Sequence, residues 1–280
     1  MFPPSGRHRC RAASPRRSGS LVLLAVVAAL VGAATPAQAA APRLDPRDTH
    51  GAWIGYSAGR EASGERASGQ LPAGALAGMD VSGHQGRVDW SRAHADGARF
   101  AYVKATEGHG FRSSSYAQQF HGAAAVGMVR GAYHFALPDR STGAVQGHFF
   151  VDNGGAWRPG SGTLPGVLDI EHNPYGEICY GLDPASMSRW IADFSSTYQA
   201  RTGRAPVIYT TASWWNQCTG ANPDVAANNP LWIARYAQEI GPLPAGWNFH
   251  SFWQHSDGGP LPGGQDAFNG GPGQLAAFAG

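Results

Sequence analysis

Seven short apolar runs of strand character recur between Leu76 and the C-terminus, each separated from the next by a longer stretch. Several of those stretches place apolar residues at helical spacing, so strands and helices alternate, as is typical of an α/β architecture. Alternation of this kind closes naturally into a barrel whose active site lies at the carboxyl ends of the strands. The predicted strands span 77–81, 100–105, 129–135, 166–170, 206–210, 231–234 and 249–254.

The longest helical pattern runs from Asp183 to Arg201. Asp183 can cap its start, Pro184 occupies its first turn, and Gly203 follows its end. Its large apolar residues share one face, so we expect core packing rather than a binding site for Met187, Trp190, Ile191, Phe194 and Tyr198. A second helix is predicted over 115–126. The last third of the chain has few helical signals, so a regular eightfold repeat is not expected.

Residues 1–39 have the pattern of a secretory signal peptide, with five arginines, an apolar run over 21–34 and a cleavage site at 37–39. The apolar run is shorter than the ~20 residues that span a membrane. We therefore predict a secreted protein without stable membrane association, with an uncleaved anchor as the alternative. The signal peptide is compatible with either the general secretory pathway or the twin-arginine pathway. Residues 40–76 are poor in apolar side chains, which predicts a loosely attached arm before a catalytic barrel over 77–280.

The charge of the chain depends on its leader. The five arginines of the leader have no accompanying acid, so the mature chain carries 16 basic residues against 19 acidic ones. It has no basic run, and Lys104 is the only lysine of the sequence. The composition therefore argues against a nucleic-acid partner.

Two cysteines, Cys179 and Cys218, remain after Cys10 is removed with the leader. In an oxidising compartment they most simply form one disulfide, with free thiols as the alternative. No cysteine or histidine set has zinc spacing, and neither His134 nor His172 belongs to a metal-binding motif. We expect neither a metal nor another cofactor.

The run 166–171 ends an apolar strand with two carboxylates, Asp169 and Glu171. Alternation along a strand puts both side chains on one face, opposite Leu168 and Ile170. Mutual repulsion and partial burial raise the pKa of one such acid. One group then keeps its proton while the other carries charge, as glycoside hydrolysis requires. The alternative is a strand that runs into a polar loop, with both acids solvated.

Three further acids follow other predicted strands: Asp80 ends the first, Glu107 lies just past the second, and Asp266 follows the last. Parallel strands would bring these groups to one rim together with Asp169 and Glu171. A cluster of like charges is costly, which indicates a functional site. The alternative for Glu107 and Asp266 is a role as a helix cap or a loop acid.

Aromatic side chains accompany these strand ends, and exposed aromatic rims are the usual platform for sugar rings. Each of these rings, taken singly, is more often a core residue than part of a binding surface. The predicted substrate-binding residues are Tyr102, Lys104, Glu107, Tyr133, Tyr209, Trp232 and Arg235.

Six motifs, taken in order, resemble glycoside hydrolase family 25, the Chalaropsis-type lysozymes. They span 78–86, 100–108, 131–135, 168–171, 208–210 and 231–236, and the resemblance covers about 77–280. It implies an irregular β/α barrel of about five β/α units with the remaining strands bare. It also implies N-acetylmuramidase activity on bacterial peptidoglycan, which cuts the β-1,4 bond after N-acetylmuramic acid with retention.

The resemblance also implies catalytic roles. Glu171 matches the family's acid/base, Asp169 its partner carboxylate, and Asp80 the first-strand aspartate. The family's closing aspartate lies in a Val-Asp-x-Asn-x-Phe run, whereas the segment here reads Gln-Asp-Ala-Phe-Asn around Asp266. For Asp169 we favour orientation of the substrate's 2-acetamido group, whose oxygen attacks the anomeric carbon, over direct nucleophilic attack.

Two other functions remain open on the sequence. Chitinase-like barrels also end a strand in Asp-x-Glu, although they carry a longer acidic run before it. A catalytically inactive wall-binding module is the second alternative, against which the retained acids Asp80, Asp169 and Glu171 argue. We expect a monomer in each case.

Overall fold

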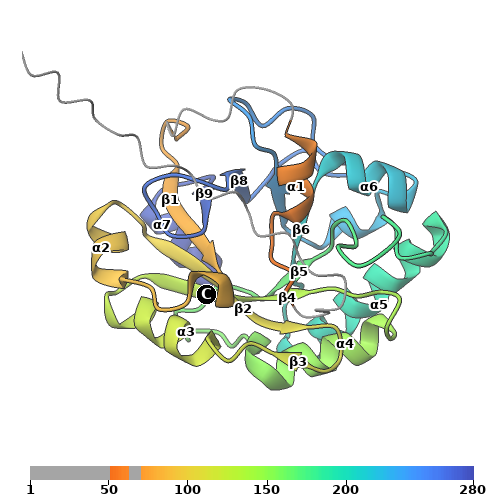
Figure 1. Cartoon of the computed structure of the whole chain (residues 1–280), viewed down its shortest axis with the longest axis horizontal. Helices are drawn as coiled ribbons and strands as arrows, with labels where there is room; N and C mark the ends of the chain where they lie inside the picture. The colour runs from red at the N-terminus through yellow and green to blue at the C-terminus, as the bar shows by residue number, and fades with distance from the viewer. Residues whose placement is uncertain (1–50, 63–70) are drawn as a thin grey trace, which may run out of the picture. The chain divides into compact units, whose positions relative to one another are not determined.

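The computed structural model describes residues 51–62 and 71–280. The predicted signal peptide and much of the predicted arm lie outside these residues. Within them, eight strands close into a barrel, and β3 extends the sheet beside β2 (Figure 1). The strands are β1 (Leu76–Val81), β2 (Phe100–Glu107), β3 (Phe111–Arg112), β4 (Val129–Phe135), β5 (Val167–Asp169), β6 (Val207–Thr210), β7 (Leu231–Ala234), β8 (Phe252–Ser256) and β9 (Gly264–Phe268).

Strands β1, β2 and β4 to β8 run parallel, whereas β9 pairs antiparallel to both β8 and β1. A helix connects each of the first five pairs of parallel strands, and no regular α-helix connects β7 to β8 or β8 to β9. The predicted irregular barrel of about five β/α units is therefore confirmed. The helices are α1 (Tyr56–Glu61), α2 (Trp90–Ala95), α3 (Tyr116–Ala125), α4 (Gly143–Phe150), α5 (Pro184–Thr202), α6 (Ala212–Thr219) and α7 (Pro272–Ala279).

Helix α5 has the ends that the sequence predicts. The Asp183 carboxylate accepts a hydrogen bond from the amide of Ser186 (2.9 Å), and Gly203 ends the helix at a φ of 80°. Its predicted apolar face is buried against the outside of the barrel. Among the described residues, no helix is both long and apolar enough to cross a membrane.

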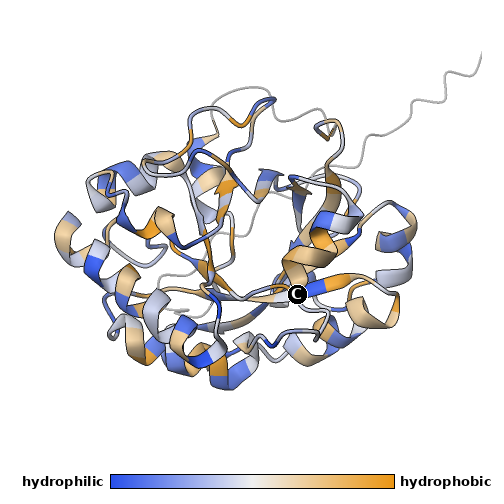
Figure 2. Ribbon diagram, turned by 180° about the vertical axis from the view of Figure 1, so that it is seen from behind, coloured by the Kyte–Doolittle hydropathy of each residue, from blue (hydrophilic) through white to orange (hydrophobic). Residues whose placement is uncertain are grey.

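The interior of the barrel is filled by alternate residues of its strands. One buried cluster takes side chains from β2 and β4 to β9, and Leu275 and Ala279 of α7 belong to the same cluster. The opposite strand faces pack against the helices in two further clusters. Figure 2 accordingly shows apolar residues along the strands and hydrophilic stretches on the surrounding helices.

Strand β9 was not predicted from the sequence, which placed Asp266 after the last strand. The short run Gly-Gln-Asp-Ala-Phe has little intrinsic strand preference, and pairing on both sides stabilises it. Close packing explains its first residue, because a Cβ on Gly264 would lie 1.9 Å from the Asp80 carboxylate. The two-residue strand β3 was likewise not predicted.

Cys179 and Cys218 form the predicted disulfide, with their Cα atoms 5.3 Å apart. Cys179 lies in the loop after β5, and Cys218 lies on α6, which follows β6. The bridge therefore ties together two neighbouring connections at the carboxyl end of the barrel.

Replacing both cysteines with alanine should lower the free energy of unfolding by about 3–4 kcal/mol, because the cross-link closes a loop of 39 residues in the unfolded chain. Urea unfolding of the variant and of the oxidised wild type measures this difference. Reduced wild type is the matched control, since it loses the cross-link without losing the buried sulfur of Cys218. Equal stability of all three forms would contradict the prediction.

Candidate active site

Four carboxyl groups meet at the carboxyl end of the barrel. Asp80 comes from β1, Asp266 from β9, Asp169 ends β5, and Glu171 lies two residues beyond it. Strand alternation turns them inward. The residues that flank Asp80 and those that flank Asp169 pack outward against the helices, and all four acids are at most 5% exposed.

Gln254 on β8 connects two of the strands that carry these acids. Its side-chain amide donates to Asp80 Oδ2 (2.6 Å), and its Oε1 accepts from the hydroxyls of Tyr209 (2.7 Å) and Tyr236 (3.0 Å). It also pairs in register with Asp266 on β9. The sequence analysis missed this residue, although its place at the end of a predicted strand was a usable signal.

Burial raises the pKa of Asp80 and of Glu171 to about 7. For Asp80, the hydrogen bond from Gln254 opposes this shift, and the charge of Glu171 adds to it. For Glu171, three backbone amides that donate to the carboxylate oppose it. A carboxylic acid with such a pKa still carries its proton in mildly acidic solution, as a general acid must.

Burial likewise raises the pKa values of Asp169 and Asp266 well above the ordinary range. The charge of Glu171 adds to the shift at Asp169, whereas Lys104 opposes it. The charge of Asp80 adds to the shift at Asp266. The site therefore concentrates acids that favour their protonated forms and that affect one another's titration.

Four of the predicted sugar-binding aromatics lie inside the barrel and are fully buried: Tyr102, Tyr133, Tyr209 and Trp232. The rings of Tyr102 and Tyr209 lie 4.9 and 5.2 Å from the Trp232 ring. The structure therefore places them in the barrel interior, in the same apolar cluster as Ile54 and Ala58, rather than on an exposed rim. Packing with rings from distant strands, which the sequence does not reveal, determines this position.

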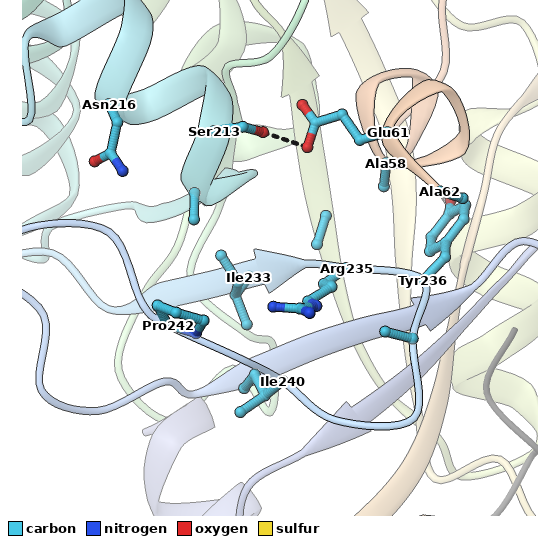
Figure 3. Close-up of a pocket in the computed structure, with 13 residues that line it drawn as sticks. Ala58, Glu61, Ala62, Ser213, Asn216, Ile233, Arg235, Tyr236, Ile240 and Pro242 are labelled. Carbon is cyan, nitrogen blue, oxygen red and sulfur yellow. Dashed lines mark hydrogen bonds between the residues drawn. The ribbon is translucent and has the colours of Figure 1, made fainter. Parts of the chain in front are cut away.

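The other predicted binding residues divide into two groups. Lys104 and Glu107 form a buried ion pair (2.5 Å), and the Tyr175 hydroxyl also donates to Glu107 (2.7 Å). Arg235 is exposed and lines a pocket of about 370 Å³ between α1, α6 and the segment after β7 (Figure 3). Glu61 of α1 and Ser213 of α6 hydrogen-bond across the wall of this pocket.

The histidine that the sequence placed near the strand ends, His134, does not form part of a metal site among the residues that the structure describes. The described residues contain no group of three or more histidines, cysteines and acids arranged to hold a metal ion. His134 is buried between Thr106 (2.7 Å) and Gln146 (2.9 Å), and burial lowers its pKa to about 3. It is therefore a neutral residue that contributes to packing and hydrogen bonding.

Residues 51–62, which the sequence analysis assigned to a loosely attached arm, contact the barrel instead. The backbone amides of Gly55, Tyr56 and Ser57 donate to the Glu171 carboxylate, and the Ala52 carbonyl accepts from Lys104. The arm prediction rested on the scarcity of apolar side chains. The scarcity did not reveal that backbone amides would bond Glu171, or that Ile54 and Ala58 would join the apolar cluster of the barrel.

Comparison with known proteins relates this chain to a family of glycosyl hydrolases. Residues 79–264 match the model of glycosyl hydrolases family 25. Lysozyme M1 of Streptomyces globisporus is 44% identical over 220 residues, which cover 77% of this chain and 75% of that protein. The N,O-diacetylmuramidase of Arthroderma benhamiae is 42% identical over 226 residues, covering 81% of this chain and 96% of its own.

A solved muramidase from Acremonium alcalophilum has 51% sequence identity and a TM-score of 0.72. The match covers 98% of that chain but only 73% of this one.

The raised acid pKa values predict that the protein loses stability as pH rises. The unfolded chain releases these protons near pH 4, whereas the folded protein holds those of Asp80 and Glu171 up to about pH 7. The folded state thus binds more protons between these values, so the free energy of unfolding falls as pH increases through that range. Urea unfolding at steps between pH 4 and pH 8 measures the slope.

Asp266→Asn should reduce this slope, because it removes one buried acid of the cluster. Glu239→Gln removes an exposed acid from the segment after β7 and should leave the slope unchanged. Stability that rises with pH over the interval would show that the acids are not protonated in the folded protein.

Proposed function

The chain belongs to glycosyl hydrolases family 25, and we propose that it is a secreted lysozyme. Its substrate is bacterial peptidoglycan, in which it hydrolyses the β-1,4 bond between N-acetylmuramic acid and N-acetylglucosamine. The observation that carries this proposal is the cluster of the buried acids Asp80, Asp169 and Glu171 at the carboxyl end of the barrel. The names of the relatives support the choice of substrate.

Glu171 is the proposed acid/base. Cleavage of a glycosidic bond needs a proton on the leaving oxygen, and burial keeps that proton on Glu171 in mildly acidic solution. After the leaving group departs, the resulting carboxylate accepts a proton from the attacking water.

Asp169 is the proposed partner carboxylate, in a retaining, substrate-assisted reaction. The 2-acetamido group of the substrate carries a carbonyl oxygen that can attack the anomeric carbon. Asp169 would then orient the amide and balance the positive charge that develops on the sugar ring.

Asp80 and Asp266 are proposed to set the charge of the site. Asp80 is held by Gln254 and raises the proton affinity of its neighbours when it is ionised. Asp266 lies beside it on the antiparallel strand β9. Both groups act through the protonation of the site and are not assigned a bond to the substrate.

Export is part of the same proposal. The basic and apolar leader with its cleavage site is a secretion signal, and the Cys179–Cys218 disulfide suits an oxidising compartment. The substrate also lies outside the cytoplasm. We propose that the exported protein acts as a monomer.

Glu171→Gln should lower the rate of wall hydrolysis ~10²–10⁴-fold, because the amide keeps the shape of the side chain but has no proton to transfer. Purified peptidoglycan, with and without O-acetylated muramic acid, is digested with a chain beginning at Leu71, since residues 51–62 contact Glu171. Mass spectrometry of the fragments identifies the reducing-end sugar.

Glu177→Gln is the matched control, an exposed acid in the same loop, and should retain the full rate. A reducing-end N-acetylmuramic acid is expected. Normal turnover by Glu171→Gln would exclude the assigned acid, and N-acetylglucosamine at the reducing end would indicate a different glycosidase.

A fluorinated sugar substrate should leave no covalent adduct on Asp169, because the acetamido group of the substrate is the proposed nucleophile. Peptide mass mapping after incubation tests this, with Asp169→Asn as the reference that cannot form the adduct. An adduct on Asp169 in the wild type would establish direct attack by the carboxylate.

A further inference from the structure

Residues 51–62 form a segment that lies over the carboxyl cluster. Five residues of this segment are buried, although it has no core of its own: Ala52, Ile54, Gly55, Ser57 and Ala58. Ile54 and Ala58 belong to the apolar cluster that fills the barrel, together with Tyr209 and Trp232. The segment therefore inserts apolar side chains into the mouth of the barrel rather than running over its surface.

The backbone of this segment hydrogen-bonds to the carboxylate of the proposed general acid, Glu171. The amides of Gly55 (3.0 Å) and Tyr56 (3.3 Å) donate to Glu171 Oε1, and the amide of Ser57 donates to Oε2 (2.5 Å). The Ser57 hydroxyl also accepts from the amide of His172 (2.7 Å). Both carboxylate oxygens are thus bound, and Glu171 is 0% exposed.

This arrangement is incompatible with the proposed reaction. A general acid must approach the glycosidic oxygen to about 2.6–3.2 Å, and the backbone of 55–57 fills that space. The three amides also stabilise the ionised form of Glu171, whereas proton donation requires the neutral form. The segment must leave before a saccharide can reach the acid.

Both ends of the segment are anchored to the barrel. At the start, the Gly51 carbonyl lies 2.7 Å from His84 Nε2, and the Ala52 carbonyl accepts from Lys104 Nζ (2.5 Å). The Ala52 amide donates to the Tyr175 hydroxyl (2.9 Å), which itself donates to Glu107. The segment therefore engages Lys104, and through Tyr175 also Glu107, both of which were predicted to bind substrate.

At the other end, the Glu61 carboxylate accepts from Thr211 (2.8 Å) and Ser213 and pairs with His172 Nε2 (3.3 Å). Burial by itself raises the pKa of Glu61. The bonds from His172, Ser213 and Thr211 outweigh that effect and place the pKa below its usual range. Glu61 is therefore held as an anion in a site made by three barrel residues.

We propose that residues 51–62 are an autoinhibitory segment that keeps the enzyme inactive until the segment is removed from the cleft. The inference rests on the proposed lysozyme function, since it concerns access to the acid of that reaction.

Gly55 offers a specific way to release the segment. Its φ is 103°, and a Cβ at this position would lie 2.4 Å from the Tyr236 hydroxyl and 2.9 Å from Gln254 Oε1. Only glycine fits between the segment and the barrel here. Gly59, four residues later, would place a Cβ no closer than 3.8 Å to any neighbouring atom, so alanine is accommodated there.

The test compares four proteins: the chain from Ala40, the chain from Leu71, and the longer chain with Gly55→Val or with Gly59→Ala. Two quantities are measured on each after circular dichroism confirms folding. The first is the rate at which fragments are released from purified peptidoglycan. The second, which does not depend on activity, is labelling of Glu171 by a carbodiimide and an amine, quantified by peptide mass mapping.

The chain from Leu71 and the Gly55→Val variant should release fragments at least 10-fold faster than the chain from Ala40. Their Glu171 should also be labelled at least 10-fold more. Gly59→Ala should match the chain from Ala40 in both measurements. If the shorter chain does not fold, the Gly55→Val variant still gives the comparison.

Equal rates with equal labelling in all four proteins would overturn the inference, and so would a slower reaction after the segment is removed. Labelling that rises on removal while no protein releases fragments has a different meaning. It upholds the covering of Glu171 by the segment and refutes the proposed lysozyme activity instead.

Discussion

The rest of this structure depends on the burial of four carboxyl groups at one end of a closed barrel. Aromatic rings fill the barrel interior beside them, where Tyr102 and Tyr209 each pack against Trp232. Such packing excludes water, so each acid titrates at a raised pKa and each charge is felt strongly by its neighbours. The same burial disfavours folding whenever the acids ionise. The buried acids that give the site its reactivity therefore lower the free energy of unfolding. The Cys179–Cys218 disulfide offsets part of that loss.

Strand β9 is the irregular element that makes this cluster possible. A hairpin brings β9 back antiparallel, so that Asp266 lies between the strands of Asp80 and Gln254 without a crossover helix. In a regular parallel barrel, a residue in the middle of a strand would lie below the rim. Here the first residue of β9, Gly264, pairs with Asp80, and Asp266 pairs with Gly78, two residues deeper and on the same inner face. The departure from the regular fold thus positions one of the four acids.

Local patterns in the sequence predicted the parts of the structure that local physics determines. Alternation of Leu168 and Ile170 with Asp169 and Glu171 was sufficient to place both acids on one face, and capping residues defined the ends of α5. Other parts depend on partners far away in the chain. Strand β9 forms through pairing on both sides. The side chain of Gln254 is held by hydrogen bonds to Tyr209, Tyr236 and Asp80, which lie elsewhere in the chain. No local pattern contains that information.

The covering segment illustrates how the proton affinity of Glu171 depends on whatever occupies the cleft. Burial is the largest cause of its raised pKa, and the three amides that achieve this burial simultaneously oppose the shift. Removal of the segment therefore has two opposite effects: water enters and lowers the pKa, while loss of the donated hydrogen bonds raises it. A bound saccharide excludes water again without donating three backbone amides to the carboxylate. Substrate binding thus restores the burial that favours the proton, at the moment when the proton is needed.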